Sequence, residues 1–437
     1  MSLVAILLAG AGVVAAGFPR RASNAVERAF RAVLAMALGI GAWSAAYAAW
    51  RLAFGEPGLA KDVCLALAGA ALWIAFRGRQ PEQDPPREPA PRWLWAVFAL
   101  AFATATAAFI EHTLRFPDGG WDAWMVWNLR ARFLVRAGDL RTAFSPRMAF
   151  LAHPDYPWLL PGVVAQAFAQ LGESRLLAAA IAGVFGVLAV AALALAVARE
   201  HGPRWGLLAG LALAALPCFA TFASNQQSDV PLALYFTIAA ALMVQARSRR
   251  ELALAGFAAG LGIWTKNEGA LYAGCLLASF LWRARDLRGS LAFAAGALPC
   301  AALLLFFKLG LAPSNDLVVF STPSGLVGHA LDLRRWAELA VLTARRIVYF
   351  QDFALWLLAE CLLLVLFVRS QPASVLGTAL FLACLAYGPI YVLQPHPLDW
   401  IFRTSADRIL TQIWPAAVLA TVPALARGLP WCMNRAP

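Results

Sequence analysis

Long apolar runs recur along the whole chain and are separated by short, basic segments. Runs such as LAGLALAALPCFATFA come close to the roughly 20 residues that a helix needs to cross the hydrocarbon core of a bilayer. These runs are continuous and do not alternate polar with apolar residues, which excludes the strand pattern of a transmembrane β-barrel. The sequence therefore predicts an all-α polytopic membrane protein.

The composition supports this class of protein. Only 14% of the 437 residues are charged and 61% are hydrophobic, whereas soluble domains carry about 25% charged residues. The net charge of +12 is typical of cytoplasmic loops that face membrane lipids, so we expect no nucleic-acid partner. The seven cysteines mostly lie in apolar runs without metal-ligand spacing, and we expect them to pack as small core hydrophobes.

Compact arginine loops predict the orientation of the helices. The positive-inside tendency places the arginines of 20–31, 77–92 and 247–250 on the cytoplasmic side. The resulting membrane topology has about thirteen transmembrane helices, with the N-terminus outside and the C-terminus inside. The predicted helices are 2–17, 32–52, 59–76, 93–111, 176–198, 206–223, 229–246, 251–265, 268–283, 289–310, 353–368, 374–393 and 408–427. The arginine-rich, lysine-poor composition is typical of bacteria with GC-rich genomes, so we expect the protein to lie in the bacterial inner membrane. The orientation given by the arginine loops predicts a site that faces the periplasm.

This topology divides the chain into four regions. They are N-terminal transmembrane helices (1–80), a proline-rich charged linker (81–92), a transmembrane catalytic module (93–310), and a C-terminal outer loop with further helices (311–437). The first large outer loop covers 112–155, and we expect it to contain amphipathic juxtamembrane helices.

Two segments do not fit as simple single crossings. Residues 156–171 are apolar enough to span, but three prolines crowd their start, and a full crossing would invert every later loop. We therefore predict a re-entrant or interfacial helix there. Residues 251–283 lie between two inside loops, so the chain crosses an even number of times and a hairpin with its outer tip at 265–268 is expected.

Several polar clusters fall on the predicted outer side. Polar groups at membrane depth cost several kcal/mol unless they are paired or hydrated, so they usually mark function. The clusters are Asp122 with its neighbouring tryptophans, HPDYP (153–157), SNQQSD (224–229), TKNE (265–268) and DWIFRTSADR (399–408). Their convergence on one face predicts a functional site there.

Asp122 follows a Pro-Asp-Gly-Gly turn and opens a helix-like stretch. One interpretation is an aspartate stabilised by the dipole at a helix N-terminus. The other is a general base that accepts the proton of an attacking hydroxyl. The adjacent Trp121 and Trp124 are either an interfacial aromatic belt or the walls of a sugar or lipid site.

Two further aspartates have both structural and functional interpretations. Asp155 lies in a turn between prolines and is either a turn residue or, with Tyr156, part of a substrate site. Asp229 begins a helix, where it is either a cap or a second acidic group that faces the same cavity.

The basic candidates have similar alternatives. Lys266, one of three lysines, either forms a local ion pair with Glu268 or holds a phosphate as a compact point charge. Arg403 and Arg408 are either snorkelling interfacial residues or a guanidinium clamp on a phosphate leaving group.

The order of these motifs resembles the C-type (GT-C) membrane glycosyltransferase superfamily. The segments that carry the resemblance are HPDYPWLLP, SNQQSDVPLALYFTIAAALM and AGFAAGLGIWTKNEGALY, within 93–285. They are similar to the proline-rich segment, the D-x-P helix start and the T-K hairpin of protein O-mannosyltransferases and lipid A aminoarabinose transferases. The chain departs from that pattern in having Ala123 where an adjacent acidic residue is common, and in having a single aspartate at Asp229.

The resemblance implies an enzyme that transfers a sugar, with inversion, from a polyprenyl-phosphate donor on the outer face. It implies that Asp122 takes the place of the catalytic aspartate, Lys266 that of a lysine near the donor phosphate, and Asp229 that of the acidic helix start. The two departures weaken any case for a bound divalent metal, and no cofactor is predicted.

The residue types agree with this chemistry, because a hydroxyl needs a base and a phosphate leaving group needs fixed cations. The sequence does not identify the sugar or the acceptor, which could be a glycan, a lipid or a protein. A transporter or flippase of an amphipathic anionic lipid is the alternative function.

Overall fold

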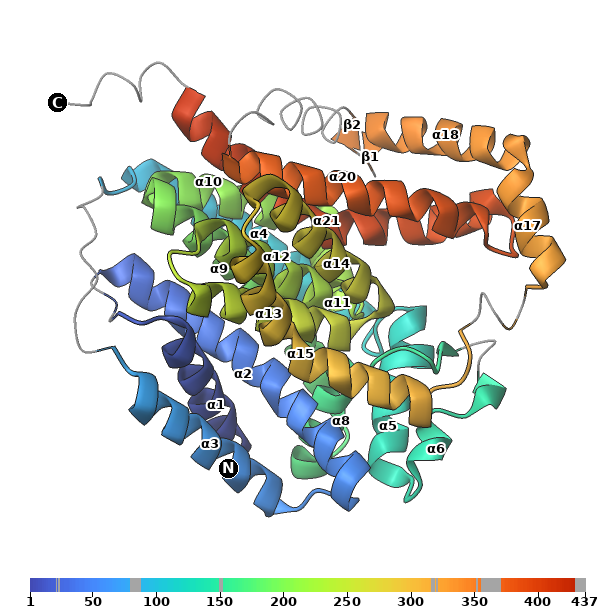
Figure 1. The fold of residues 1–437 in the computed structure, drawn as a ribbon, viewed down its shortest axis with the longest axis horizontal. Helices are drawn as coiled ribbons and strands as arrows, with labels where there is room; N and C mark the ends of the chain where they lie inside the picture. The colour runs from blue at the N-terminus through green and yellow to red at the C-terminus, as the bar shows by residue number, and fades with distance from the viewer. Residues whose placement is uncertain are drawn as a thin grey trace.

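In the computed structural model the chain is a bundle of helices (Figure 1). The structure describes residues 1–20, 22, 24–78, 88–148, 152–315, 319, 321–350, 353–354 and 371–428. Most of the predicted linker 81–92, and all but the first two residues of the predicted helix 353–368, lie outside the described residues.

The elements follow one another in three groups. The first contains α1 (Ser2–Gly17), α2 (Ala25–Phe54), α3 (Leu59–Phe76), α4 (Arg92–Arg115) and the short elements η1 (Ala123–Trp127), α5 (Asn128–Arg136), α6 (Leu140–Ala143) and η2 (Pro146–Met148). The second contains α8 (Leu159–Leu171), α9 (Arg175–His201), α10 (Pro203–Ala214), α11 (Pro217–Ser224), α12 (Asp229–Gln245), α13 (Arg249–Thr265), α14 (Asn267–Ala284) and α15 (Leu287–Gly310). The third contains α17 (Pro323–Leu331), α18 (Leu333–Val348), the strand pair β1 (Tyr349–Phe350) and β2 (Phe353–Ala354), α20 (Gln371–Val392) and α21 (Leu398–Gly428).

Local capping signals account for several helix starts. The Asn24 side chain accepts a hydrogen bond from the Glu27 amide at 2.8 Å, at the start of α2. Ser248 caps α13 by accepting from the Glu251 amide at 3.3 Å, and Asp286 caps α15. Each side chain satisfies a backbone donor that the first helical turn leaves unpaired.

Among the described residues, six helices are long and apolar enough to cross a membrane. They are α2, α3, α4, α9, α15 and the part of α20 from Val375 to Val392. A bent pair, α10 with α11, raises the number to seven, so the predicted count of about thirteen is not confirmed. Helix α8 has only 13 residues, which is short for a full crossing.

The predicted helix 206–223 is divided in the structure. Helices α10 and α11 meet at an angle of 67°, and α11 begins at Pro217. Proline lacks the amide hydrogen that would continue the helical ladder from α10, which accounts for the break at this position.

Helix α12 lies at the centre of the bundle. It packs against α9, α13 and α21, and nearly all of its residues are buried. The sequence DVPLALYFTIAAALMVQ is apolar on every face after its first residue, and such a helix is stable only when neighbours surround it. Its position carries the one acidic residue of the helix, Asp229, into the interior at one end.

The N-terminal helices lie on the opposite side of α12 from the C-terminal helices α18, α20 and α21 (Figure 1). A buried ion pair connects them to the central helices, since Arg199 Nε of α9 lies 2.8 Å from Glu27 Oε2 of α2. The other oxygen of Glu27 accepts from Arg31 at 2.6 Å. Removing either partner of a buried pair leaves an uncompensated charge, so Glu27 fixes how α2 packs on α9.

The polar segments that were predicted to lie outside the membrane contain more helix than expected. The segment 394–408 was expected as a loop, but α21 begins at Leu398 and continues to Gly428. Leu398 and Phe402, one turn apart, are both buried, so one face of this turn packs on the protein while polar residues occupy the other. Helices α17 and α18 lie within the expected loop 311–352, and the first outer loop contains η1, α5 and α6, as predicted.

Candidate active site

Arg408 lies among the polar groups of the segments that were predicted to face outward. Its Nη1 atom is 2.7 Å from Asp122 Oδ2, and its Nε atom is 3.1 Å from Asp229 Oδ2. The three residues come from the loop after α4, the start of α12 and the second half of the DWIFRTSADR segment. The guanidinium group presents donors in several directions in one plane, which allows a single arginine to bridge two carboxylates.

Lys266 joins the same cluster from the junction between α13 and α14. Its Nζ atom lies 3.0 Å from Asp229 Oδ1 and 2.8 Å from Glu268 Oε1. Burial opposes the charged form of this lysine, but the two carboxylates together outweigh it and raise the pKa of Lys266 above its ordinary value. The local pair with Glu268 is therefore present, together with a second, longer-range pair that the sequence did not reveal.

The α13–α14 junction depends on a close approach between two backbones. A Cβ atom placed on Gly269 would lie 1.9 Å from the carbonyl oxygen of Gly262. Lys266 itself has extended backbone angles and separates the two helices as their single connecting residue. The glycine contact therefore holds the lysine at a sharp turn that faces the start of α12.

Gln412 is a member of the cluster that sequence reasoning missed. It lies one helical turn after Arg408 on α21 and donates a hydrogen bond from Nε2 to Asp229 Oδ1. Its Oε1 accepts from the Tyr272 hydroxyl at 2.7 Å. The four-residue spacing from Arg408 lies within the predicted helix 408–427, so the shared helix face was a signal that could have indicated Gln412.

The two aspartates of the cluster differ in their access to solvent. The Asp229 side chain is completely buried, whereas 24% of the Asp122 side chain is exposed. Asp229 is surrounded by Lys266, Arg408 and Gln412, which use both of its oxygens. Asp122 is thus the carboxylate that an incoming molecule can reach.

Asp122 occupies an unusual backbone position. It precedes η1, a single turn of π-helix, and among the described residues its carboxylate pairs with Arg408 and does not cap the helix. π-Helical turns occur often at functional sites. The Gly120 amide donates to the Asn225 carbonyl at 3.1 Å, so the SNQQSD segment holds this loop in place.

Tyr156 lies beside the cluster in a stack of aromatic rings. It stacks on Trp127 at 5.7 Å and on His153 at 5.2 Å between ring centroids, and the Lys266 ammonium lies 5.8 Å from its ring. The buried Arg130 donates to the carbonyl oxygens of Ala152, His153 and Tyr156 and so fixes the HPDYP backbone. Burial lowers the pKa of Arg130 to about 10.

Asp155 braces the site and is not a member of the central cluster. Its Oδ2 atom accepts hydrogen bonds from Asn267 at 2.8 Å, Asn315 at 2.9 Å and Lys308 at 3.1 Å. Burial favours its neutral form, but the Lys308 ammonium and the two amides together outweigh burial and lower the pKa of Asp155. The aspartate therefore ties the HPDYP turn to α14, to α15 and to the segment after α15.

The three remaining candidate residues also lie outside the cluster. Arg403 pairs with Asp399 at 2.8 Å on the exposed face of α21. Trp121 and Trp124 are both about half exposed, and their rings meet edge to face at 5.5 Å. This arrangement agrees with an interfacial aromatic belt beside Asp122.

The cluster contains two cations, Arg408 and Lys266, and three carboxylates, those of Asp122, Asp229 and Glu268. Within the described part of the chain, no group of three or more His, Cys, Asp or Glu side chains is arranged to hold a metal ion. Three buried oxygens at its edge, Glu268 Oε2, Gln227 Oε1 and Ser228 Oγ, have no hydrogen-bond partner among the described residues.

Residues 153–307 match a protein-family model described as dolichyl-phosphate-mannose-protein mannosyltransferase. The match covers less than half of the chain and includes the HPDYP, SNQQSD and TKNE segments, whereas Asp122 and Arg408 lie outside it. No curated protein and no solved structure matches the chain. The predicted resemblance is confirmed over these residues, and the match implies a membrane glycosyltransferase of the GT-C type.

Proposed function

We propose that this protein is an inverting glycosyltransferase that moves a sugar from a polyprenyl-phosphate donor to an acceptor hydroxyl at the outer face of the bacterial inner membrane. The observation that carries the proposal is the bridge of Arg408 between Asp122 and the buried Asp229, with Lys266 on the same aspartate. This bridge combines an accessible base with two fixed cations, which are the groups that such a transfer requires.

Asp122 is the general base in this proposal because its side chain is the most exposed of the three carboxylates in the cluster. It accepts the proton of the acceptor hydroxyl while the hydroxyl oxygen attacks the anomeric carbon of the donor. The bond between that carbon and the phosphate oxygen breaks, and the polyprenyl phosphate leaves as an anion. Direct attack from the face opposite the leaving group inverts the anomeric centre, through an oxocarbenium-like transition state.

Arg408 and Lys266 hold the phosphate of the donor. Both cations are directed by Asp229, which is completely buried and therefore acts as a positioning residue. A phosphate that binds Arg408 competes with Asp122 for the same guanidinium group. Donor binding would then release Asp122 from its 2.7 Å ion pair and make the base available to the acceptor.

The sugar has potential partners beside the cations. Glu268 Oε2, Gln227 Oε1 and Ser228 Oγ are buried and have no hydrogen-bond partner among the described residues, so they become acceptors for sugar hydroxyls once donor binding displaces the side chains that cover them. Buried acceptors without partners cost free energy, and a bound polyhydroxylated substrate would remove that cost.

The test is turnover of lipid-linked sugars by the purified full chain. The protein is incubated with a panel of polyprenyl-phosphate sugars, and the release of free polyprenyl phosphate is measured for wild type, Asp122→Asn and Asp399→Asn. We expect release by wild type, a loss of about 10²–10⁴-fold in Asp122→Asn, and no change in Asp399→Asn, whose carboxylate is in the exposed pair with Arg403.

Two results would contradict the proposal. If folded Asp122→Asn released polyprenyl phosphate at the wild-type rate, Asp122 would be excluded as the base. Binding of the donors without release of polyprenyl phosphate would favour the flippase, which is then tested by transfer of the lipid across a vesicle bilayer.

A further inference from the structure

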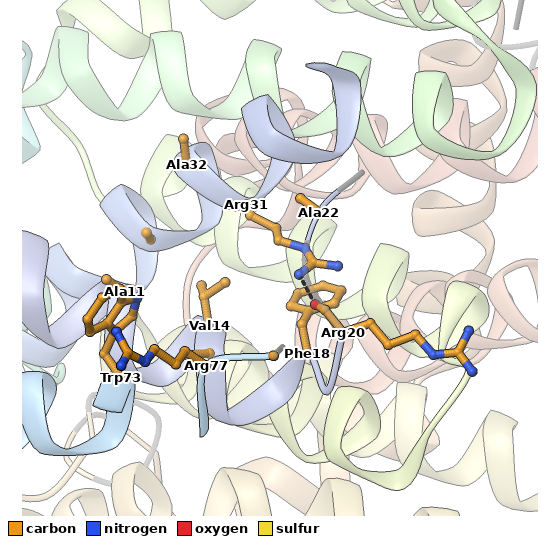
Figure 2. A pocket seen from close by; sticks show the side chains of 12 residues that line it. Ala11, Val14, Phe18, Arg20, Ala22, Arg31, Ala32, Trp73 and Arg77 are labelled. Atoms are coloured by element: carbon orange, nitrogen blue, oxygen red, sulfur yellow. Dashed lines mark hydrogen bonds between the residues drawn. The ribbon is translucent and has the colours of Figure 1, made fainter. Parts of the chain in front are cut away.

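A cavity of about 640 Å³ lies among the three N-terminal helices, far in sequence from the cluster around Arg408. Its walls come from the ends of α1 and α3 and from the first part of α2 (Figure 2). The predicted topology places these ends on the cytoplasmic side, at the arginine loops 20–31 and 77–92.

Glycines bring the three helices into close contact beside the cavity. A Cβ atom on Gly10 would lie 1.8 Å from the Ala35 carbonyl oxygen, and one on Gly12 would lie 2.3 Å from the Gly69 carbonyl oxygen. These contacts bring α1 against both α2 and α3. Small residues such as Ala15 and Ala32 line the space that remains between the helices.

Two guanidinium groups lie on different walls of this cavity. Arg31 lies over the Phe18 ring at 4.2 Å, and it is also held by Glu27 and by the carbonyl oxygen of Arg20. Arg77 lies over the Trp73 ring at 4.9 Å. In Figure 2 these two arginines flank Val14, whereas the Arg20 side chain points away from it. Aromatic rings hold both guanidinium groups in place at the mouth of an apolar cavity.

We propose that this cavity is a binding site for an anionic phospholipid of the inner leaflet. The headgroup phosphate binds Arg77, and one acyl chain lies against the alanines and Val14 that line the cavity. Among the described lining residues there are three arginines and no carboxylate, and although Glu27 pairs with Arg31 at 2.6 Å from outside the lining, the excess of positive charge favours an anion. Basic pockets between transmembrane helices on the cytoplasmic side are the type of site that anionic headgroups occupy.

The apolar walls identify a lipid and not a free anion. A soluble phosphate would be held by the guanidinium groups alone and would leave the alanine-lined part of the cavity exposed to water. An acyl chain fills that part and removes apolar surface from water, which adds to the binding free energy. Because Arg199 of α9 also lies over Phe18, at 5.3 Å, lipid binding is expected to stabilise the packing of the N-terminal helices on the central bundle.

The experiment measures lipid retention by the full chain in neutral detergent after thorough removal of native lipid. Phosphatidylglycerol, phosphatidylcholine and inorganic phosphate are added separately, and bound lipid is measured by native mass spectrometry together with the melting temperature. The variants are Arg77→Gln at the headgroup position and Ala32→Leu on the apolar wall of the cavity. Arg288→Gln, at an exposed arginine near the start of α15, is the matched control.

We expect wild type and Arg288→Gln to retain phosphatidylglycerol in preference to phosphatidylcholine. Arg77→Gln is expected to weaken retention about fivefold, the contribution of one basic side chain at an anionic lipid surface. Ala32→Leu is expected to weaken it with all the charges intact, and its melting temperature without lipid shows that it is folded.

The proposal is overturned if phosphatidylcholine is retained equally well, or if Arg77→Gln and Ala32→Leu both retain phosphatidylglycerol as wild type does. Inorganic phosphate that raises the melting temperature as much as phosphatidylglycerol would show a plain anion site. None of these results bears on the transferase proposal, because no residue of the cluster around Arg408 is altered.

Discussion

Replacing Asp229 by asparagine is the most informative perturbation of the buried cluster. The two side chains have the same shape, so the change removes one negative charge and little volume. Asparagine can still accept one hydrogen bond, but it cannot neutralise Lys266 or Arg408. Both cations would then depend on Glu268 and Asp122, which are the more exposed members of the cluster.

The size of the effect follows from burial and from the distances. Asp229 is completely buried, only 4% of the Lys266 side chain is exposed, and the two ion pairs measure 3.0 and 3.1 Å. Removing one partner of a buried ion pair costs about 3–5 kcal/mol, because the remaining charge stays desolvated. For a chain of this length, an unfolding entropy of typical size converts this cost into a fall of roughly 3–5 °C in Tm.

The assay is thermal unfolding in detergent, with Asp399→Asn as the exposed control. Asp399→Asn is expected to leave Tm unchanged, because exposed pairs contribute little. Lys266→Met should cost less stability in the Asp229→Asn background than in wild type, because Lys266 has then already lost one of its two carboxylate partners. An unchanged Tm in Asp229→Asn, or a double variant that loses the sum of both single effects, would refute the reasoning.

Three further predictions concern the site and its supports. Arg408→Lys keeps the charge but cannot bridge two carboxylates, so turnover of a lipid-linked sugar should fall roughly 10–100-fold, while Arg403→Lys should match wild type. Because the pKa of Asp155 is lowered in the folded state, its contribution to stability is complete above the unfolded-state pKa of about 3.9 and is lost as the pH falls through the folded-state pKa. The Tm measured across this acidic range should therefore fall more steeply in wild type than in Asp155→Asn. Gly269→Ala should lower Tm because its Cβ would meet a backbone carbonyl oxygen at 1.9 Å. Gly274→Ala should raise or preserve Tm, because among the described residues no atom lies within 4 Å of its added Cβ. Equal effects of the two substitutions would contradict the close-approach argument.

The sequence alone predicted the all-α membrane class and the resemblance that the family model bears out over 153–307. It also predicted that Asp122, Asp229, Lys266 and Arg408 lie on one side of the membrane, and the structure brings these four side chains into one cluster. This prediction was possible because apolar length and basic loops determine which helix ends share a face, whatever the packing between the helices.

Only the tertiary structure separated Arg408 from Arg403. Both lie in DWIFRTSADR, and the expected loop treated them alike. The structure continues α21 back to Leu398, so residues five apart point in directions about 140° apart around the helix axis, and one of the two arginines faces solvent. The bracing of Asp155 by Lys308 and Asn315, and the hydrogen bond from Gln412 to Asp229, likewise depend on contacts between distant segments. Such contacts follow from how the helices pack, and the hydropathy of a sequence does not indicate which side chains face each other across a helix interface.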